Sequence, residues 1–144
     1  MKKETVFLLV EDDEVDIMAM KRAFRQHKIA NDLVVTQDGM EALEVLNGTH
    51  ATIPRPSSAI VLLDLNMPRM NGHEFLDAIR HDERLKSLVV FILTSSAHDS
   101  DIQQAYSNHV AGYIVKSDFA NGGLTQALEL LDHYWRVVEL PPLT

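Results

Sequence analysis

Apolar and polar positions follow two patterns that alternate along the chain. Short unbroken runs of Val, Ile and Leu are typical of strands buried on both faces of a sheet, and they predict strands at residues 6–10, 33–36, 59–63, 89–93 and 112–115. Segments in which apolar residues recur every three or four positions are typical of amphipathic helices. They predict helices at residues 14–26, 40–46, 72–81, 99–108 and 124–137.

The predicted elements alternate strictly, strand then helix, five times. Strands connected through helices run parallel, with helices covering both faces of the sheet. This alternation indicates an α/β protein with a flavodoxin-like (βα)5 fold, a doubly wound five-stranded parallel sheet in the order 2-1-3-4-5. The connection at residues 47–58 is longer than the roughly two to six residues usual in such folds. At the predicted start of helix 99–108, Ser100 and Gln103 have capping-box spacing.

Polar residues stand where the predicted strands end. In the expected strand order, the carboxyl ends of the first and third strands are neighbours at the point where the winding reverses, which is where such sheets bind ligands. We therefore expect carboxylates at the centre of a crevice, with a hydroxyl and an ammonium group to one side. The residues at these strand ends are Glu11, Asp12, Asp13, Asp64, Thr94 and Lys116.

The expected carboxylate cluster favours a divalent cation. Close carboxylates repel one another, so at least one takes up a proton unless a cation is present. Oxygen ligands suit Mg²⁺ or Mn²⁺, and the absence of cysteine excludes Cys-ligated zinc. Asp12 and Asp64 are the best direct ligands and Glu11 is expected to act through water, while the main-chain carbonyl of Asn66 offers a further oxygen.

Thr94 and Lys116 extend this prediction to a phosphoryl group, because a metal ion alone requires neither. Aspartate can act as a nucleophile and form an aspartyl phosphate. Lys116 would then neutralise one phosphoryl oxygen and Thr94 would donate to another. Each charge-assisted hydrogen bond contributes about 1.5–3 kcal/mol. Two or three of them match the roughly 5.5 kcal/mol that drives a two-state element from 1:99 to 99:1.

Four segments together resemble the receiver domains of two-component response regulators. They are LLVEDDE, LLDLNMPRMNG, LTSS and GYIVKS, in this order, and the resemblance covers about residues 5–131. It implies a receiver domain over residues 1–138, phosphorylated on Asp64 by the phosphohistidine of a partner kinase. A short tail, residues 139–144, is expected to follow without an output domain.

The resemblance also implies roles for the other residues of the crevice. Thr94 corresponds to the switch hydroxyl of the family, and Lys116 corresponds to its phosphate-binding lysine. Tyr113 matches the aromatic switch position, which turns inward when Thr94 moves toward the phosphoryl group. The implied Mg²⁺ or Mn²⁺ site consists of Glu11, Asp12, Asp64 and Asn66.

One departure from the family pattern concerns the residue after Lys116. Receiver domains usually have a proline there, in a cis peptide bond, whereas this chain has Ser117. A cis bond without proline costs about 2.5–4 kcal/mol. Either the site retains that strain, which we expect, or the bond is trans and Lys116 is aimed differently.

The Lys-Ser pair is similar to that of the single-domain regulators that serve phytochrome-type histidine kinases. The long loop at residues 47–58 and the segment HYWRVVELPP are similar to theirs as well. Tyr134 and Trp135 in that segment either pack back on the domain or form a contact surface. We favour the surface, because aromatic residues are enriched in interface cores, and expect a homodimer through the last helix and tail.

The net charge and the distribution of apolar residues limit the classes of partner that we expect for this chain. The 144 residues carry a formal net charge of −8, which argues against nucleic acid and against an anionic membrane surface. The sequence shows neither a signal peptide nor an apolar stretch of membrane-spanning length. We therefore expect a cytoplasmic protein.

Two other functions compete with a phosphorylation switch. A Mg²⁺-dependent phosphohydrolase with an aspartate nucleophile usually needs a second acid two residues later, where this chain has Asn66. We therefore expect no turnover enzyme, only self-catalysed phosphotransfer and autodephosphorylation. The remaining alternative is a receiver-like binding module that never takes a phosphoryl group.

Overall fold

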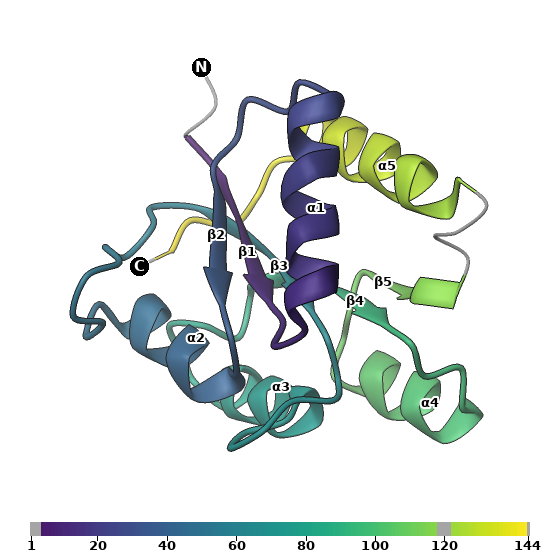
Figure 1. Cartoon of the computed structure of the whole chain (residues 1–144). Helices are drawn as coiled ribbons and strands as arrows, with labels where there is room; N and C mark the ends of the chain where they lie inside the picture. The colour runs from purple at the N-terminus through teal and green to yellow at the C-terminus, as the bar shows by residue number, and fades with distance from the viewer. Residues whose placement is uncertain (1–3, 118–121, 144) are drawn as a thin grey trace.

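The computed structural model describes residues 4–117 and 122–143, which form one parallel sheet between two layers of helices (Figure 1). The strand order is β2-β1-β3-β4-β5, and each neighbouring pair is parallel. This confirms the predicted flavodoxin-like fold. The strands are β1 (Val6–Val10), β2 (Leu33–Thr36), β3 (Ala59–Leu63), β4 (Val89–Thr94) and β5 (Gly112–Val115).

The helices cover the two faces of the sheet as the doubly wound topology requires (Figure 1). The bounds of all five agree with the predicted ranges to within one residue. One face is covered by α1 (Glu14–Gln26) and α5 (Gly123–Val137). The other is covered by α2 (Gly39–Asn47), α3 (Gly72–Arg80) and α4 (Asp99–Ser107).

Alternate side chains of each central strand enter two separate hydrophobic clusters. Leu8 and Val10 of β1 pack with α2 and α3, whereas Phe7 and Leu9 pack with α1 and α5. In β3 every residue is buried, because both faces of this central strand are covered. In the part of the chain that the structure describes, no helix combines the length and apolar character needed to cross a bilayer.

Side-chain caps fix the starts of the helices next to the strand ends. Asp13 caps α1 by accepting from the amides of Val15 and Asp16, and Asn71 forms a capping box with Glu74 at α3. The capping box predicted at Ser100 is wrong. Helix α4 already begins at Asp99, with His98 at the cap position and no side-chain cap bond, so Ser100 lies inside the helix.

The segment after α5 folds back against the domain. Tyr134 packs edge-on against Phe91, with ring centroids 5.2 Å apart, and Trp135 packs against the same cluster. Leu140 and Leu143 of the tail contact one cluster each. The structure favours intramolecular packing for the two aromatics, and the homodimer stays a prediction. Residue 144 of the predicted tail lies outside the described residues.

The long loop between α2 and β3 is held by one imidazole. His50 Nε2 lies 3.1 Å from Glu41 Oε2, and His50 Nδ1 accepts from the amides of Thr52 and Ile53 at 3.1 and 3.0 Å. Two amides donating to Nδ1 place the proton on Nε2, which donates to Glu41. His50 therefore organises the first half of the loop and ties it to α2.

Replacing His50 with alanine is expected to lower the free energy of unfolding by about 2 kcal/mol, because it removes three hydrogen bonds, two of them partly buried, and each contributes about 0.5–1.5 kcal/mol. Urea denaturation measures the change. His133→Ala on the exposed face of α5 is the matched control and should cost little. Equal midpoints for the two variants would show that the imidazole does not hold the loop.

Candidate functional site

The acidic residues of the site follow β1 and β3 directly, and the sheet brings them together. Val10 of β1 and Leu63 of β3 are register partners. The amide of Asp64 donates to the Val10 carbonyl at 3.0 Å, and the amide of Glu11 donates to the Thr36 carbonyl at 2.9 Å. Both main chains thus stay in the hydrogen-bonding ladder. The carboxylates of Glu11 and Asp64 therefore emerge side by side at the carboxyl edge of the sheet.

Three carboxylates converge at this edge, as the sequence predicts. One oxygen from each of Glu11, Asp12 and Asp64 lies within 4.8 Å of the others. Glu11 and Asp64 are buried, at 2% and 7% exposure, whereas Asp12 is exposed. A set of oxygens with one side open to water fits a hard divalent ion that keeps part of its water shell.

Lys116, from the end of β5, reaches into this cluster. Its ammonium group donates to the carboxylate of Glu11, to Asp16 Oδ2 at 2.8 Å and to Asp64 Oδ2 at 3.3 Å. The expected cis bond after Lys116 is wrong. The described residues contain no cis peptide bond, as the energetic preference for trans bonds without proline dictates. Lys116 nevertheless points at Asp64.

Burial and charge shift the ionisation of this pair. Burial raises the pKa of Glu11 to about 8, although the hydrogen bond from Lys116 opposes the shift. For Lys116, burial lowers the pKa, but the hydrogen bonds to Asp16 and Glu11 and the charge of Asp64 outweigh it and raise the pKa overall. Lys116 is therefore charged, and Glu11 holds a proton easily while no divalent ion is bound.

The predicted switch residues lie one and two strands away from Asp64. Thr94 ends β4, is fully buried, and accepts from the Ser96 amide at 3.5 Å. Tyr113 on β5 is half-buried, and its hydroxyl donates to the Ser96 carbonyl at 2.9 Å. Both residues therefore contact the loop after β4. Asn66 lies at the rim of the site, where its amide donates to Asp64 Oδ1 at 3.3 Å.

Side-chain hydrogen bonds also connect the loop after β4 to two helices. The Ser96 hydroxyl donates to Asp101 Oδ2 at 2.5 Å, and His73 Nε2 lies 3.0 Å from Asp101 Oδ1. The hydrogen bonds to Ser96 and His73 lower the pKa of Asp101. Residues on α3, α4 and β5 thus hold the loop that follows Thr94.

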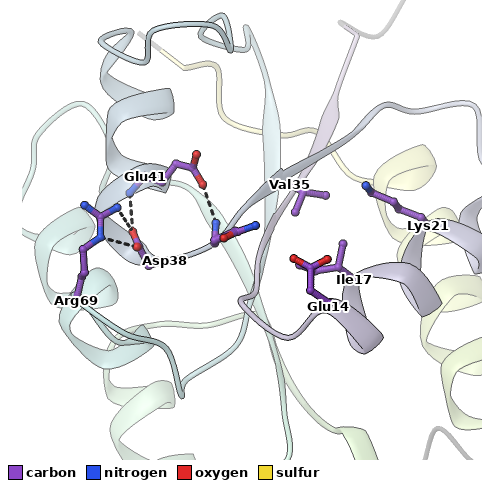
Figure 2. Close-up of a pocket in the computed structure, with 8 residues that line it drawn as sticks. Glu14, Ile17, Lys21, Val35, Asp38, Glu41 and Arg69 are labelled. Atoms are coloured by element: carbon purple, nitrogen blue, oxygen red, sulfur yellow. Dashed lines mark hydrogen bonds and ion pairs between the residues drawn. The ribbon is translucent and has the colours of Figure 1, made fainter.

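Beside the site lies an open groove of about 510 Å³ between α1, the end of β2 and the start of α2 (Figure 2). Arg69 closes one side by donating to both carboxylate oxygens of Asp38 at 2.7 and 3.0 Å. Burial alone raises the pKa of Asp38, but Arg69 outweighs it and lowers the pKa. The groove is lined by Glu14, Ile17, Lys21, Val35, Gln37, Asp38, Glu41 and Arg69.

Two contacts in and beside the site were not predicted from the sequence. Asp38 precedes a predicted helix, which suggests only a cap, and its pairing with Arg69 has no local signal. Asp16 is an acidic residue in the first turn of a helix, where the helix dipole already explains it. Its contact with Lys116 joins residues 100 positions apart.

The fold and this edge of the sheet define a doubly wound α/β protein with an acidic site at its topological switch point. The family profile described as "Response regulator receiver domain" matches residues 7–129. The chain therefore belongs to the receiver domain family of response regulators and is a protein of two-component signalling.

Individual relatives refine this assignment. The chain is 37% identical over 133 residues to the probable methanogenesis regulatory protein FilR2 of Methanothrix harundinacea (strain 6Ac), a match that covers 90% of this chain and 83% of that protein. It resembles the crystal structure of the phosphorylated cyanobacterial phytochrome response regulator RcpA, with a TM-score of 0.81, 33% identity, and coverage of 98% of this chain and 99% of that one.

A second structural relative was solved with a metal. It is the Mn²⁺-bound form of the response regulator Rcp1, with a TM-score of 0.81, 31% identity, and coverage of 94% of this chain and 98% of that one. The response regulator Rcp1 of Synechocystis sp. (strain ATCC 27184 / PCC 6803 / Kazusa) is 32% identical over 94% of this chain and 92% of its own length. The predicted similarity to regulators of phytochrome-type kinases is confirmed.

Proposed function

We propose that this receiver domain accepts a phosphoryl group on Asp64 from the phosphohistidine of a sensor kinase, in a Mg²⁺-dependent reaction. The proposal rests mainly on the geometry of the site. The carboxylates of Glu11, Asp12 and Asp64 lie close together, and Lys116 donates to an oxygen of Asp64. In this reaction an Asp64 oxygen attacks phosphorus, the phosphorus–nitrogen bond breaks, and the departing imidazole takes up a proton.

In this proposal, side chains and main-chain amides of the site orient Asp64 and stabilise the phosphoryl oxygens. Asp64 is 7% exposed, so its nucleophilic oxygen is largely shielded from water. The Asn66 amide and the Lys116 ammonium each donate to one of its oxygens, which orients the carboxylate. Lys116 passes to a phosphoryl oxygen when the negative charge appears there, and the Thr94 hydroxyl donates to another.

Glu11, Asp12, Asp64 and the Asn66 carbonyl would hold Mg²⁺, with Mn²⁺ as a second suitable ion. When bound, the ion neutralises charge on the carboxylates and on the incoming phosphoryl oxygens. The exposed Asp12 and the buried Glu11 and Asp64 offer oxygens only. The Mn²⁺-bound form of the related Rcp1 agrees with this choice of ion.

Mg²⁺ binding is expected to strengthen as the pH rises toward 8. Burial raises the pKa of Glu11 to about 8, and a protonated carboxyl group no longer attracts the ion, so binding releases a proton below that pKa. The apparent dissociation constant should fall by up to about tenfold per pH unit and then level off. Calorimetry in two buffers of different ionisation enthalpy measures the released proton. An affinity that does not change between about pH 6 and about pH 8 would contradict this coupling.

Phosphorylation would switch the surface formed by the loop after β4, α4 and β5. Thr94 moves toward the phosphoryl group, the Ser96 carbonyl moves with it, and the Tyr113 side chain turns inward. Output then follows from protein contacts or from onward transfer of the phosphoryl group, without multiple turnover of a substrate.

The proposed partner is a phytochrome-type histidine kinase, in line with the names of RcpA and of other structural relatives. The receiver domain would comprise residues 1–138, followed by the tail at 139–144, and act in the cytoplasm without nucleic acid or membrane. A homodimer through α5 and the tail is supported by the exposure of Leu130 and Val137, at 52% and 77%. Sedimentation before and after phosphorylation tests it.

The proposed function is tested with acetyl phosphate as the phosphoryl donor and mass spectrometry as the readout. The intact protein should gain one phosphoryl group in the presence of Mg²⁺ and none in the presence of EDTA. No gain under either condition would favour the alternative, a receiver-like module that binds partners without phosphorylation. Transfer from candidate kinases of the source organism then identifies the physiological donor.

A further inference from the structure

Lys116 has a partner outside the carboxylate cluster. Its ammonium group lies 2.8 Å from Asp16 Oδ2 and 3.3 Å from Asp64 Oδ2, so the bond to Asp16 is the shorter of the two. Asp16 belongs to the first turn of α1, and its oxygens are not part of the cluster of Glu11, Asp12 and Asp64. Asp16 is therefore not one of the proposed metal ligands.

The local hydrogen bonds explain why Asp16 points at Lys116. Asp16 stands three residues after the helix cap Asp13, where an acidic side chain could reach back to the cap amide. That amide already donates to Glu11 Oε2 at 3.2 Å. The carboxylate of Asp16 is therefore available, and it turns toward the ammonium group of Lys116.

Lys116 and a divalent ion require the same oxygens. The ammonium group has three N–H donors, and among the described residues its partners are Glu11, Asp16 and Asp64. Two of these are proposed metal ligands, and a cation bound to them repels Lys116. A divalent ion can bind to Glu11 and Asp64 without a large electrostatic cost only if another anion continues to hold Lys116. Asp16 is placed to be that anion.

The space around Lys116 allows this shift. A cavity of about 20 Å³ is lined by Glu11, Asp16 and Lys116 together with apolar side chains. That volume accommodates about one water molecule. A water molecule in this cavity can accept a hydrogen bond from the Lys116 N–H that no longer donates to Glu11. Each N–H donor of Lys116 then keeps a partner.

We propose that Asp16 is a positioning residue that retains Lys116 beside the site when Mg²⁺ occupies Glu11 and Asp64. The inference rests on the metal site of the proposed function. It assigns Asp16 the task of separating two cations that would otherwise compete, and it predicts that Asp16 strengthens Mg²⁺ binding through Lys116 and not merely through its own charge.

The test is Mg²⁺ titration of the full chain by calorimetry. Asp16→Asn should raise the dissociation constant roughly tenfold, which is about 1.4 kcal/mol. Glu14→Gln removes the same charge from the same helical turn, with an exposed side chain, and should raise it no more than about twofold. Asp16→Glu restores the carboxylate and should recover most of the affinity. Circular dichroism confirms that each variant is folded.

A second pair of variants isolates the role of Lys116. Lys116→Gln should tighten Mg²⁺ binding, because the competing ammonium group is gone. In that background Asp16→Asn should have no larger effect than Glu14→Gln. A tenfold loss that persists without Lys116 would overturn the inference, as would equal effects of Asp16→Asn and Glu14→Gln in the parent protein. Failure of the parent protein to bind Mg²⁺ would instead overturn the metal site of the proposed function, and the inference with it.

Discussion

Replacing Asp64 with asparagine is expected to abolish phosphoryl incorporation from acetyl phosphate. The amide has no charged oxygen to attack phosphorus, and it also removes one proposed metal ligand. The fold should survive, because Asp64 stands at the end of β3 and its main-chain bond to Val10 is unaffected. Mass spectrometry of the intact chain measures the loss, and hydroxylamine treatment of the parent protein should remove the phosphoryl group, as expected for an acyl phosphate.

The matched control is Asp13→Ser. Asp13 is a neighbouring carboxylate whose side chain caps α1 through the amides of Val15 and Asp16, and serine is also a good helix cap. This variant should incorporate phosphate as the parent protein does. Incorporation that persists in Asp64→Asn, or a phosphoryl group that resists hydroxylamine, would assign the acceptor to another residue.

Replacing Gly72 with alanine is expected to destabilise the protein by about 3 kcal/mol or more, at the upper end of the cost of overpacking. A Cβ atom at Gly72 would lie 2.6 Å from the Asp64 carbonyl oxygen and 2.7 Å from Leu65 Cα. Both are backbone atoms, so the clash cannot be relieved by rotating a side chain. The melting temperature should fall by about 6–12 °C, and phosphorylation should slow because the main chain of Asp64 is displaced.

Gly122→Ala separates this clash from the general cost of replacing a glycine. Gly122 has a φ of +85°, but a Cβ there would meet no atom within 4 Å. Alanine in this left-handed conformation costs about 1–2 kcal/mol. Urea denaturation compares the two variants. If Gly72→Ala were as stable as Gly122→Ala, the close approach of α3 to the end of β3 would not constrain the site.

The sequence predicts the fold well because each element is signalled locally. The apolar run of β3 indicates burial on both faces, and every residue of the strand is buried. The strict alternation of strands and helices determines the order of winding and hence the edge at which the strand ends meet. Glu11, Asp12 and Asp64 are therefore found together without any knowledge of side-chain geometry.

The features that escape prediction depend on contacts between distant segments. Asp16 and Lys116 meet because the start of α1 and the end of β5 both lie at the carboxyl edge of the sheet, and nothing in the sequence near Asp16 signals its contact with Lys116. His50 is one of seven histidines, and only the course of the loop shows that its ring accepts two amides. The expectation of a cis bond after Lys116 rests on resemblance, whereas Ser117 itself gives no steric reason for one.

The hydrogen bonds that hold the loop after β4 also couple its position to that of the neighbouring elements. Ser96 is linked through its carbonyl to Tyr113 on β5 and through its hydroxyl to Asp101 on α4, which in turn holds His73 on α3. The loop and these elements therefore form one cooperative unit. A displacement of the loop beside Thr94 would therefore be transmitted to α4 and β5, where a bound protein would sense it at a distance from Asp64.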